Sequence, residues 1–199
     1  MAKLYFRYGA MNCGKSTQLI QVAHNYEERH QRVLVWKPSL DNRDGVDVIR
    51  PRIGIQRKVD QLIGPDTDIL SISELLEESG ELSRPDCILI DEAQFLTKAQ
   101  VWALSDVVDQ LGIPVICYGI RTDAFGELFP GSAQLMAIAN SIEEIKTICW
   151  CGRKAIINSR VDQSGNVLYS GEQVDIGHHY ISLCRYHWKA GQTAPKGIV

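Results

Sequence analysis

A glycine and lysine pattern near the N-terminus has the spacing of a phosphate-binding loop. Residues 7–19 read RYGAMNCGKSTQL, in which Gly9, Gly14, Lys15 and Ser16 complete the P-loop pattern. Polyphosphate carries several negative charges, so backbone N–H groups must converge on it, and glycine permits the tight turn. Lys15 would reach the β- and γ-phosphates and Ser16 would bind Mg²⁺, at the positive end of the following helix. The alternative is a glycine-rich strand-to-helix turn with an exposed lysine.

Two adjacent carboxylates follow an apolar run further along the chain. The segment CILIDEAQF places Asp91 and Glu92 at the carboxyl end of a predicted buried strand, and ligands of open parallel sheets bind at that edge. Asp91 suits the Mg²⁺ shell of a P-loop enzyme. Glu92 beside it could take a proton from an attacking hydroxyl. The alternative for either acid is to cap the helix that follows.

Three cysteines and a histidine near the C-terminus form two close pairs, Cys149-Trp-Cys151 and Cys184-x-x-His187. Three thiolates and an imidazole suit a tetrahedral zinc ion, and four protein ligands would make that zinc structural. The ion would close the base of the loop over residues 152–183. A disulfide or unrelated thiols are the competing interpretations. The other cysteines are predicted to be buried or partly buried thiols: Cys13, Cys87 and Cys117.

Apolar runs alternate with helical periodicity around these groups, which predicts an α/β fold. We expect a P-loop NTPase-type parallel sheet flanked by helices, with a small zinc-stapled lasso domain. The predicted strands cover residues 3–8, 32–36, 86–92, 113–120 and 142–148, and the predicted helices cover residues 16–29, 71–79, 98–111 and 129–139. The polar stretch 38–64 is predicted to be loop with one weak strand.

The alternation of apolar strands with helices ends before Cys149, which predicts two domains. Residues 1–148 would form the nucleotide-binding α/β domain and residues 149–190 the zinc-binding lasso domain, with residues 191–199 as a flexible tail. Within the second domain, residues 154–173 are predicted to form a hairpin that turns at DQSGN.

Composition restricts the possible partners. The chain has 199 residues and a formal net charge of −3, which argues against a general basic surface for duplex nucleic acid. No apolar run approaches the ~20 residues that a membrane span needs. The N-terminal MAKLYFRYG is too short and too interrupted by charge for a signal peptide. We therefore expect a soluble, cytoplasmic protein with no nucleic-acid or membrane partner.

Five segments together resemble the type II thymidine kinase family, the cytosolic, zinc-containing kind: GAMNCGKST, LIDEAQF, CYGIRTDAFGELF, TICWCGRKA and YISLCRYH. The resemblance runs over about residues 1–190. It implies transfer of the ATP γ-phosphoryl to the 5′-hydroxyl of thymidine, giving dTMP in deoxynucleotide salvage, and it implies that deoxyuridine is also accepted. It also implies ATP as co-substrate, Mg²⁺, structural Zn²⁺ held by the four ligands above, and a homotetramer or dimer.

The resemblance further implies the role of individual residues. Glu92 would be the proton acceptor, and Ser16 and Asp91 would hold magnesium. The ATP site would comprise Gly9, Ala10, Met11, Asn12, Cys13, Gly14, Lys15, Ser16, Asp91, Glu92, Ala93 and Gln94. The nucleoside site would comprise Phe95, Phe125, Phe129, Gln173, Val174, Asp175, Ile176, Gly177 and Tyr180. The segment from Gln173 to Gly177 is the lasso, which would close over the base and bind it largely through its backbone.

The sequence departs from the family pattern in two places. RTDAF stands where bacterial members read RTDF, so either Phe125 turns into the pocket or Ala124 gives a different pocket wall. The lasso is also short between Gly177 and Tyr180. Core packing is the alternative role for Phe95 and Phe129. Asp41 and Arg43, in the sequence DNR, match a polar motif that helps to hold metal and phosphates.

Two rival functions are considered. The first is an ATP-driven nucleic-acid-binding switch whose Cys/His module is a zinc ribbon, but the charge over residues 149–189 is mixed rather than basic. The second is a non-catalytic, zinc-stapled interaction protein, which would leave the P-loop unexplained.

Overall fold

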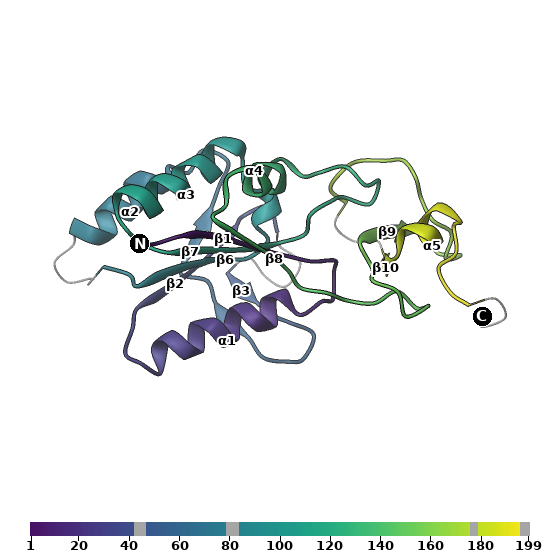
Figure 1. Ribbon diagram of the computed structural model, residues 1–199, viewed down its shortest axis with the longest axis horizontal. Coiled ribbons are helices and arrows are strands. Elements are labelled where there is room, and N and C mark those ends of the chain that lie inside the picture. Colours follow the sequence, from purple (N-terminus) through teal and green to yellow (C-terminus); the bar gives the residue numbers. More distant parts are fainter. Residues whose placement is uncertain (42–46, 79–83, 176–178, 196–199) are drawn as a thin grey trace.

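A six-stranded sheet forms the centre of the molecule (Figure 1). The computed structural model describes residues 1–41, 47–78, 84–175 and 179–195. All neighbouring strands of this sheet are parallel, in the order β5-β2-β6-β7-β1-β8. The strands are β1 (Leu4–Tyr8), β2 (Val33–Pro38), β5 (Gln61–Ile63), β6 (Cys87–Ile90), β7 (Val115–Gly119) and β8 (Ser141–Glu144). The predicted α/β fold with a parallel sheet is confirmed.

Helices cover both faces of this sheet, because successive strand residues point to opposite sides. In Figure 1, α1 (Lys15–Glu27) lies on one face, and α2 (Ile69–Glu78), α3 (Lys98–Gln110) and α4 (Pro130–Ile138) lie on the other. In β2, Leu34 and Trp36 belong to the core under α3, whereas Val33 and Val35 pack with residues of α1. Continuous apolar strands are typical of a sheet buried on both faces.

In the stretch predicted as loop with one weak strand, the part that the structure describes (residues 38–41 and 47–64) contains three short strands. β3 (Val48–Ile49) and β4 (Arg57–Lys58) form a small antiparallel pair, and β5 joins the main sheet beside β2. Asp60 helps to hold this edge, because its carboxylate accepts a hydrogen bond from the Val35 amide at 2.7 Å. Strands of two or three residues are too short to show a recognisable period, so the sequence did not predict them.

A second, two-stranded sheet lies at one end of the molecule (Figure 1). It pairs β9 (Ile157–Val161) with β10 (His179–Leu183), and α5 (Arg185–Lys189) follows. The predicted turn at residues 162–166 forms, with the Gly165 amide donating to the Asp162 carbonyl. The predicted second arm forms only in part: Val167 bridges to Val161 and the Leu168 amide donates to the Arg160 carbonyl at 2.9 Å, but the segment is not a strand, and the strand that pairs with β9 is β10.

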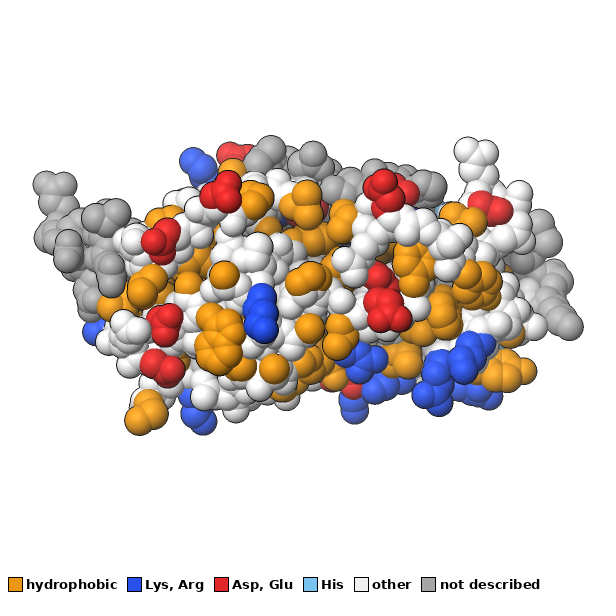
Figure 2. Space-filling model, turned by 90° about the horizontal axis from the view of Figure 1, so that it is seen from above, with side chains coloured by type: hydrophobic (Ala, Val, Ile, Leu, Met, Phe, Trp, Pro, Cys, Tyr) orange, Lys and Arg blue, Asp and Glu red, His pale blue; other side chains and the backbone are white. Residues whose placement is uncertain are grey.

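Charged groups of both signs are distributed over the face seen in Figure 2, and Lys and Arg gather toward the end that carries β9 and β10 in Figure 1. Among the helices that the structure describes, none has both the length and the apolar character that a bilayer crossing requires.

Candidate active site

The P-loop turn lies between β1 and α1 and shows why its glycines are needed. Gly14 is the N-cap of α1 and has φ +89°, a left-handed conformation that favours glycine. A Cβ on Gly9 would lie 2.3 Å from the Ile145 carbonyl oxygen, so this position admits no side chain. The buried Lys15 ammonium donates to the carbonyl of Ala10 at 2.9 Å and contacts that of Gly9 at 3.3 Å. The lysine charge is therefore enclosed by the loop itself.

A buried carboxylate adjoins this loop at the end of β6. Asp91 is 3% exposed and accepts hydrogen bonds from the Ser16 hydroxyl and from the Glu92 amide. Burial, together with the negative charge of Glu92, raises the pKa of Asp91 to about 7, while the Ser16 hydrogen bond and the Lys15 charge act in the opposite direction. A carboxylate beside a hydroxyl, both facing a phosphate-binding loop, is the donor set that Mg²⁺ prefers.

Glu92 has a strained backbone and a fixed side chain. Its φ of 49° and ψ of 39° are left-handed, which is uncommon for a residue with a side chain. Its carboxylate accepts a short hydrogen bond from the amide nitrogen of Gln94, whose own oxygen accepts from the Ile120 amide at 3.1 Å. Gln94 is 1% exposed, so a buried amide joins Glu92 to the end of β7. This arrangement orients the Glu92 carboxylate.

The segment that follows Glu92 is held by a close approach of α4. The short helix η1 (Ala93–Phe95) presents its carbonyl groups to Gly131, near the start of α4. A Cβ on Gly131 would lie 2.6 Å from the Ala93 oxygen and 2.9 Å from the Gln94 oxygen. The absence of a side chain at Gly131 therefore lets α4 approach the backbone that carries Glu92 and Gln94.

One cavity of about 640 Å³ joins these groups to the end of the molecule that carries β9 and β10. It brings together many of the residues that the sequence predicted for the two ligands, namely Met11, Asn12, Gly14, Lys15, Ser16, Glu92, Gln94, Phe95, Phe129, Gln173, Val174, Asp175 and Tyr180. Lining residues that were not predicted are Thr17, Arg50, Pro51, Arg52, Ile53, Ile120, Thr122, Asp123 and Asn158; Ala124, the alternative given above for the pocket wall, and His179 also border the cavity. Gly9 and Ala10 border a small neighbouring hollow, and Asp91 and Ala93 are buried beside the cavity.

Two aromatic rings form part of the cavity wall. Phe95 and Phe129 meet edge to face, with ring centroids 5.7 Å apart, and both border the cavity. In the sequence RTDAF, Ala124 borders the cavity, whereas Phe125 is not among the described residues that do so. The Phe125 ring faces the Arg160 guanidinium instead, 5.4 Å from its centroid. The pocket wall therefore differs from the RTDF pattern, and Phe125 lies behind it.

The described part of the lasso is fastened to the rest of the cavity by side chains. Gln173 donates to the Asp123 carboxylate at 3.1 Å, and Tyr180 donates its hydroxyl proton to the Asp175 carbonyl at 2.9 Å. The predictions for Ile176, Gly177 and Arg43 lie outside the described residues.

The DNR motif contributes a buried ion pair. Asp41 lies 3.0 Å from the Lys37 ammonium, at the end of β2. Both side chains are almost fully buried, and the end of β2 lies on the same edge of the sheet as the end of β6. Asp41 is therefore a buried, paired carboxylate near the phosphate-binding edge of the sheet. It is not among the described residues that border the cavity.

Two polar residues that the sequence analysis missed join the second sheet to the P-loop. The Met11 amide donates to the Asn158 side chain at 2.6 Å, and the Ser182 hydroxyl donates to the Met11 carbonyl at 2.9 Å. Asn158 lies on β9 and is 3% exposed. The sequence offered no local signal for Asn158, because β9 reads INSRV and also carries Ser159 and Arg160; its buried amide requires a partner, which the Met11 backbone supplies.

The four predicted zinc ligands converge at the other side of this sheet. Their ligand atoms all lie within 4.8 Å of one another. The Nδ1 atom of His187 is 3.4 Å from the Cys149 sulfur and 3.5 Å from the Cys184 sulfur, and the sulfurs of Cys151 and Cys184 are 3.9 Å apart. In a tetrahedral site with usual zinc bond lengths, such edges are about 3.6 Å for S···N and about 3.8 Å for S···S. The donor set and its spacing therefore fit zinc.

The ring of Trp150 supports this cluster. It stacks on the His187 imidazole at a centroid distance of 4.1 Å and an interplanar angle of 16°. Cys149, Cys184 and His187 are buried among Ala155 and Leu183. With four protein ligands the centre leaves no position for water or substrate, which defines it as a structural site.

A parallel α/β sheet with a P-loop after its first strand, acids after a nearby strand and a Cys/His cluster that fits zinc defines a P-loop nucleotide-binding protein. Comparison with known proteins agrees, since residues 2–188 match the family model described as thymidine kinase. The chain belongs to the thymidine kinase family.

Curated relatives cover nearly the whole chain. A thymidine kinase of Idiomarina loihiensis is 53% identical over 191 residues, which are 95% of this chain and 97% of that protein. The thymidine kinase of Yersinia pseudotuberculosis is 50% identical over 95% of each chain. That of Vibrio cholerae is 48% identical over 95% of this chain and 97% of its own.

Proposed function

We propose that the protein transfers the γ-phosphoryl group of ATP to the 5′-hydroxyl of thymidine, giving ADP and dTMP for deoxynucleotide salvage, and that it accepts deoxyuridine as well. The observation that carries this proposal is the single cavity that joins the P-loop, Glu92 and the lasso. A donor phosphate and an acceptor alcohol held in one cavity react as if in one molecule, which is how positioning accelerates phosphoryl transfer.

The reaction divides between three groups of this chain. The backbone of residues 9–16 and the Lys15 ammonium hold the β- and γ-phosphates of ATP. Glu92 accepts the proton of the 5′-hydroxyl as the bond from that oxygen to the γ-phosphorus forms and the bond from the γ-phosphorus to the ADP oxygen breaks. Gln94 keeps the Glu92 carboxylate oriented through its hydrogen bond.

Magnesium and zinc would have different roles. Ser16 and Asp91 would hold Mg²⁺, which when bound supplies positive charge to the phosphates. Cys149, Cys151, Cys184 and His187 would hold Zn²⁺, which closes the base of the segment that carries the lasso. With both metals bound, Glu92 would still be the group that accepts the proton of the 5′-hydroxyl.

The nucleoside would occupy the other half of the cavity. Phe95 and Phe129 offer apolar faces to the base. Gln173, Val174 and Asp175 approach it from the segment between β9 and β10, and Tyr180 approaches it from β10. The predicted contacts of Phe125 would then be indirect, because its ring faces Arg160. Exclusion of water by the lasso would favour transfer to the nucleoside over hydrolysis of ATP.

The test is ADP formation by the purified protein with a panel of nucleosides: thymidine, deoxyuridine, deoxycytidine, deoxyadenosine and deoxyguanosine. We expect turnover with thymidine and deoxyuridine and little with the others. Failure of every nucleoside to stimulate ADP formation would refute the proposal.

A nucleic-acid-dependent ATPase is the second candidate, because Lys and Arg gather at the end of the molecule that carries β9 and β10 (Figure 2). Two cations near the zinc ligands are engaged locally: Lys154 pairs with Glu144 at 2.8 Å, and Arg153 lies over the Tyr186 ring. Adding single-stranded DNA to the same assay separates the two functions. Stimulation by DNA without nucleoside would favour the switch.

The domain division at residue 149, a homotetramer or dimer, the cytoplasmic location and the lack of nucleic-acid and membrane partners stay predictions. Size-exclusion chromatography with light scattering tests the oligomer.

A further inference from the structure

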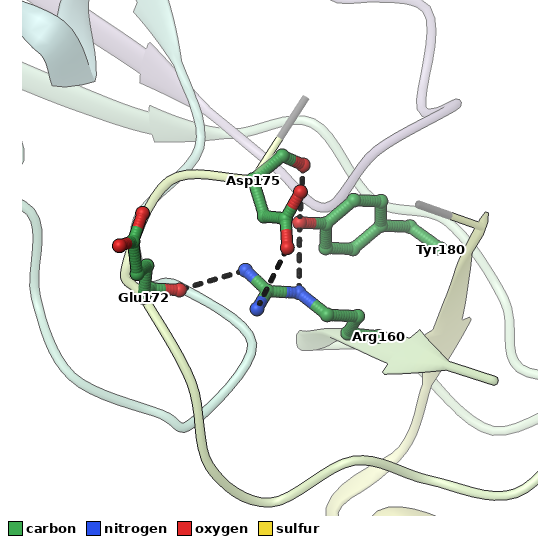
Figure 3. A network of polar contacts seen from close by, with 4 residues as sticks. All are labelled: Arg160, Glu172, Asp175 and Tyr180. Atoms are coloured by element: carbon green, nitrogen blue, oxygen red, sulfur yellow. Dashed lines mark hydrogen bonds and ion pairs between the residues drawn. The ribbon is translucent and has the colours of Figure 1, made fainter. Parts of the chain in front are cut away.

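Arg160 is a buried cation for which the sequence analysis found no role. It lies on β9, is 2% exposed, and projects toward the chain that leads into the lasso. Figure 3 shows its guanidinium surrounded by Glu172, Asp175 and Tyr180. A charged side chain is seldom buried to this degree unless its donors are satisfied, so its contacts explain its position.

The three guanidinium nitrogens each contact a different residue, namely Glu172, Asp175 or Tyr180 (Figure 3). One donates to the Glu172 carbonyl at 2.8 Å, and another lies 3.5 Å from the Asp175 carboxylate. The third donates to the Tyr180 hydroxyl at 3.1 Å. Since Tyr180 in turn donates to the Asp175 carbonyl, Glu172, Asp175 and Tyr180 form one network around Arg160. A planar guanidinium with donors on three separate nitrogens suits this task, whereas the donors of an ammonium all diverge from one nitrogen.

Aromatic rings and a glycine complete the enclosure. The Arg160 guanidinium carbon lies 5.4 Å from the Phe125 ring centroid and 5.7 Å from that of Tyr180. A Cβ on Gly171, which has φ +137°, would lie 2.9 Å from an Arg160 nitrogen. The chain can therefore pass close to the guanidinium just before the lasso begins.

Arg160 is not among the described residues that border the cavity, whereas Asp175 and Tyr180 are. We propose that Arg160 is a positioning residue for the nucleoside: it holds residues 172–175 and Tyr180 in the arrangement that receives the base. This inference rests on the proposed function, because it takes those residues to bind thymidine. It also gives Phe125 a role, since the ring supports the guanidinium from behind the pocket wall.

The expected effect follows from pre-organisation. Without Arg160, the lasso must be ordered at the moment when the nucleoside binds, and this lowers affinity without touching the reacting atoms. Arg160→Met keeps the length of the stem and removes the guanidinium. We expect it to raise the KM for thymidine by about tenfold or more. The turnover number at saturating thymidine and the KM for ATP should stay within about twofold, because binding is lost equally from ground and transition states.

The experiment compares four purified proteins with the unaltered chain. Arg160→Met and Arg160→Lys are the test variants, and lysine should restore part of the affinity as a single point charge. Phe125→Leu removes the supporting ring and should raise the KM for thymidine in the same direction, by less. Arg153→Met is the matched control, because Arg153 also lies over a tyrosine ring, is exposed and does not border the described cavity.

Two further measurements separate positioning from general damage. Zinc content by atomic absorption should be equal in all five proteins. Hydrogen exchange of the ligand-free protein should be faster at residues 172–175 in Arg160→Met and unchanged at residues 149–151. If Arg160→Met does not fold, Phe125→Leu carries the test alone.

The outcomes are distinguishable. An unchanged KM for thymidine in Arg160→Met, or equal rises for thymidine and ATP, would overturn the positioning role and leave the proposed function intact. If the unaltered protein phosphorylates no nucleoside, the proposed function fails instead, and the inference fails with it.

Discussion

Replacing Glu92 by glutamine tests the proton acceptor with little disturbance of its surroundings. Both side chains have the same shape and adopt the left-handed backbone of this position with similar strain. The new amide oxygen can accept the hydrogen bond that Gln94 now donates to the carboxylate. The substitution therefore removes proton acceptance and a negative charge while the local packing is retained.

The magnitude follows from what is lost. A positioned general base contributes about 10²- to 10⁴-fold to a rate, which corresponds to roughly 2.7–5.5 kcal/mol of barrier. Gln94 and the Ile120 amide still fix the side chain, so nearly all of that loss should appear in the turnover number. ATP affinity should change by less than about threefold, because the P-loop amides and Lys15 are unaltered.

The assay is steady-state ADP formation with thymidine, together with calorimetric titration of ATP. Glu127→Gln is the matched control, since Glu127 is an exposed acid that does not border the described cavity. A fall in turnover of less than about tenfold in Glu92→Gln would refute the assignment of the proton to Glu92.

Three other substitutions probe the rest of the site. Lys15→Met should lower kcat/KM for ATP by about 10²-fold or more, measured by steady-state kinetics. Cys151→Ser should reduce bound zinc, measured by atomic absorption, and lower the Tm, measured by calorimetry, by about 4 °C or more if about 2 kcal/mol is lost; full retention of zinc would contradict the ligand assignment. Gly131→Ala should cost about 1–3 kcal/mol of unfolding free energy in urea, because its methyl group would meet the Ala93 oxygen at 2.6 Å. It should also lower turnover, and equal stability and turnover would contradict the close packing of α4 on η1.

Local spacing explains what could be predicted from the sequence. Gly9, Gly14, Lys15 and Ser16 act within one turn, so their pattern alone defines the loop between β1 and α1. The alternation of apolar strands and amphipathic helices similarly predicts a parallel sheet. Two pairs of ligands with fixed internal spacing predicted the metal centre, whose atoms the structure brings together.

Long-range pairing explains what could not be predicted. β9 pairs with β10 over its whole length, whereas the segment after the nearby turn contacts it only at Val167 and Leu168, and no local signal predicts this difference. Arg160 resembles a surface charge in the sequence, and its burial depends on acceptors that the chain supplies only after the fold has formed. Asn158 is similar, because its partner Met11 is 147 positions away. The Phe125 ring packs against the Arg160 guanidinium and does not border the described cavity, and this contact could not be predicted without knowing where Arg160 lies.

The most direct test of the central claim is to follow the transferred phosphoryl group itself. The protein is incubated with ATP labelled at the γ-phosphate and with thymidine, and the nucleoside product is isolated and its phosphate position determined. The account predicts labelled thymidine 5′-monophosphate, and no labelled nucleotide from 5′-deoxythymidine, which lacks the acceptor hydroxyl. Label on the 3′-oxygen, or label released only as inorganic phosphate, would contradict it.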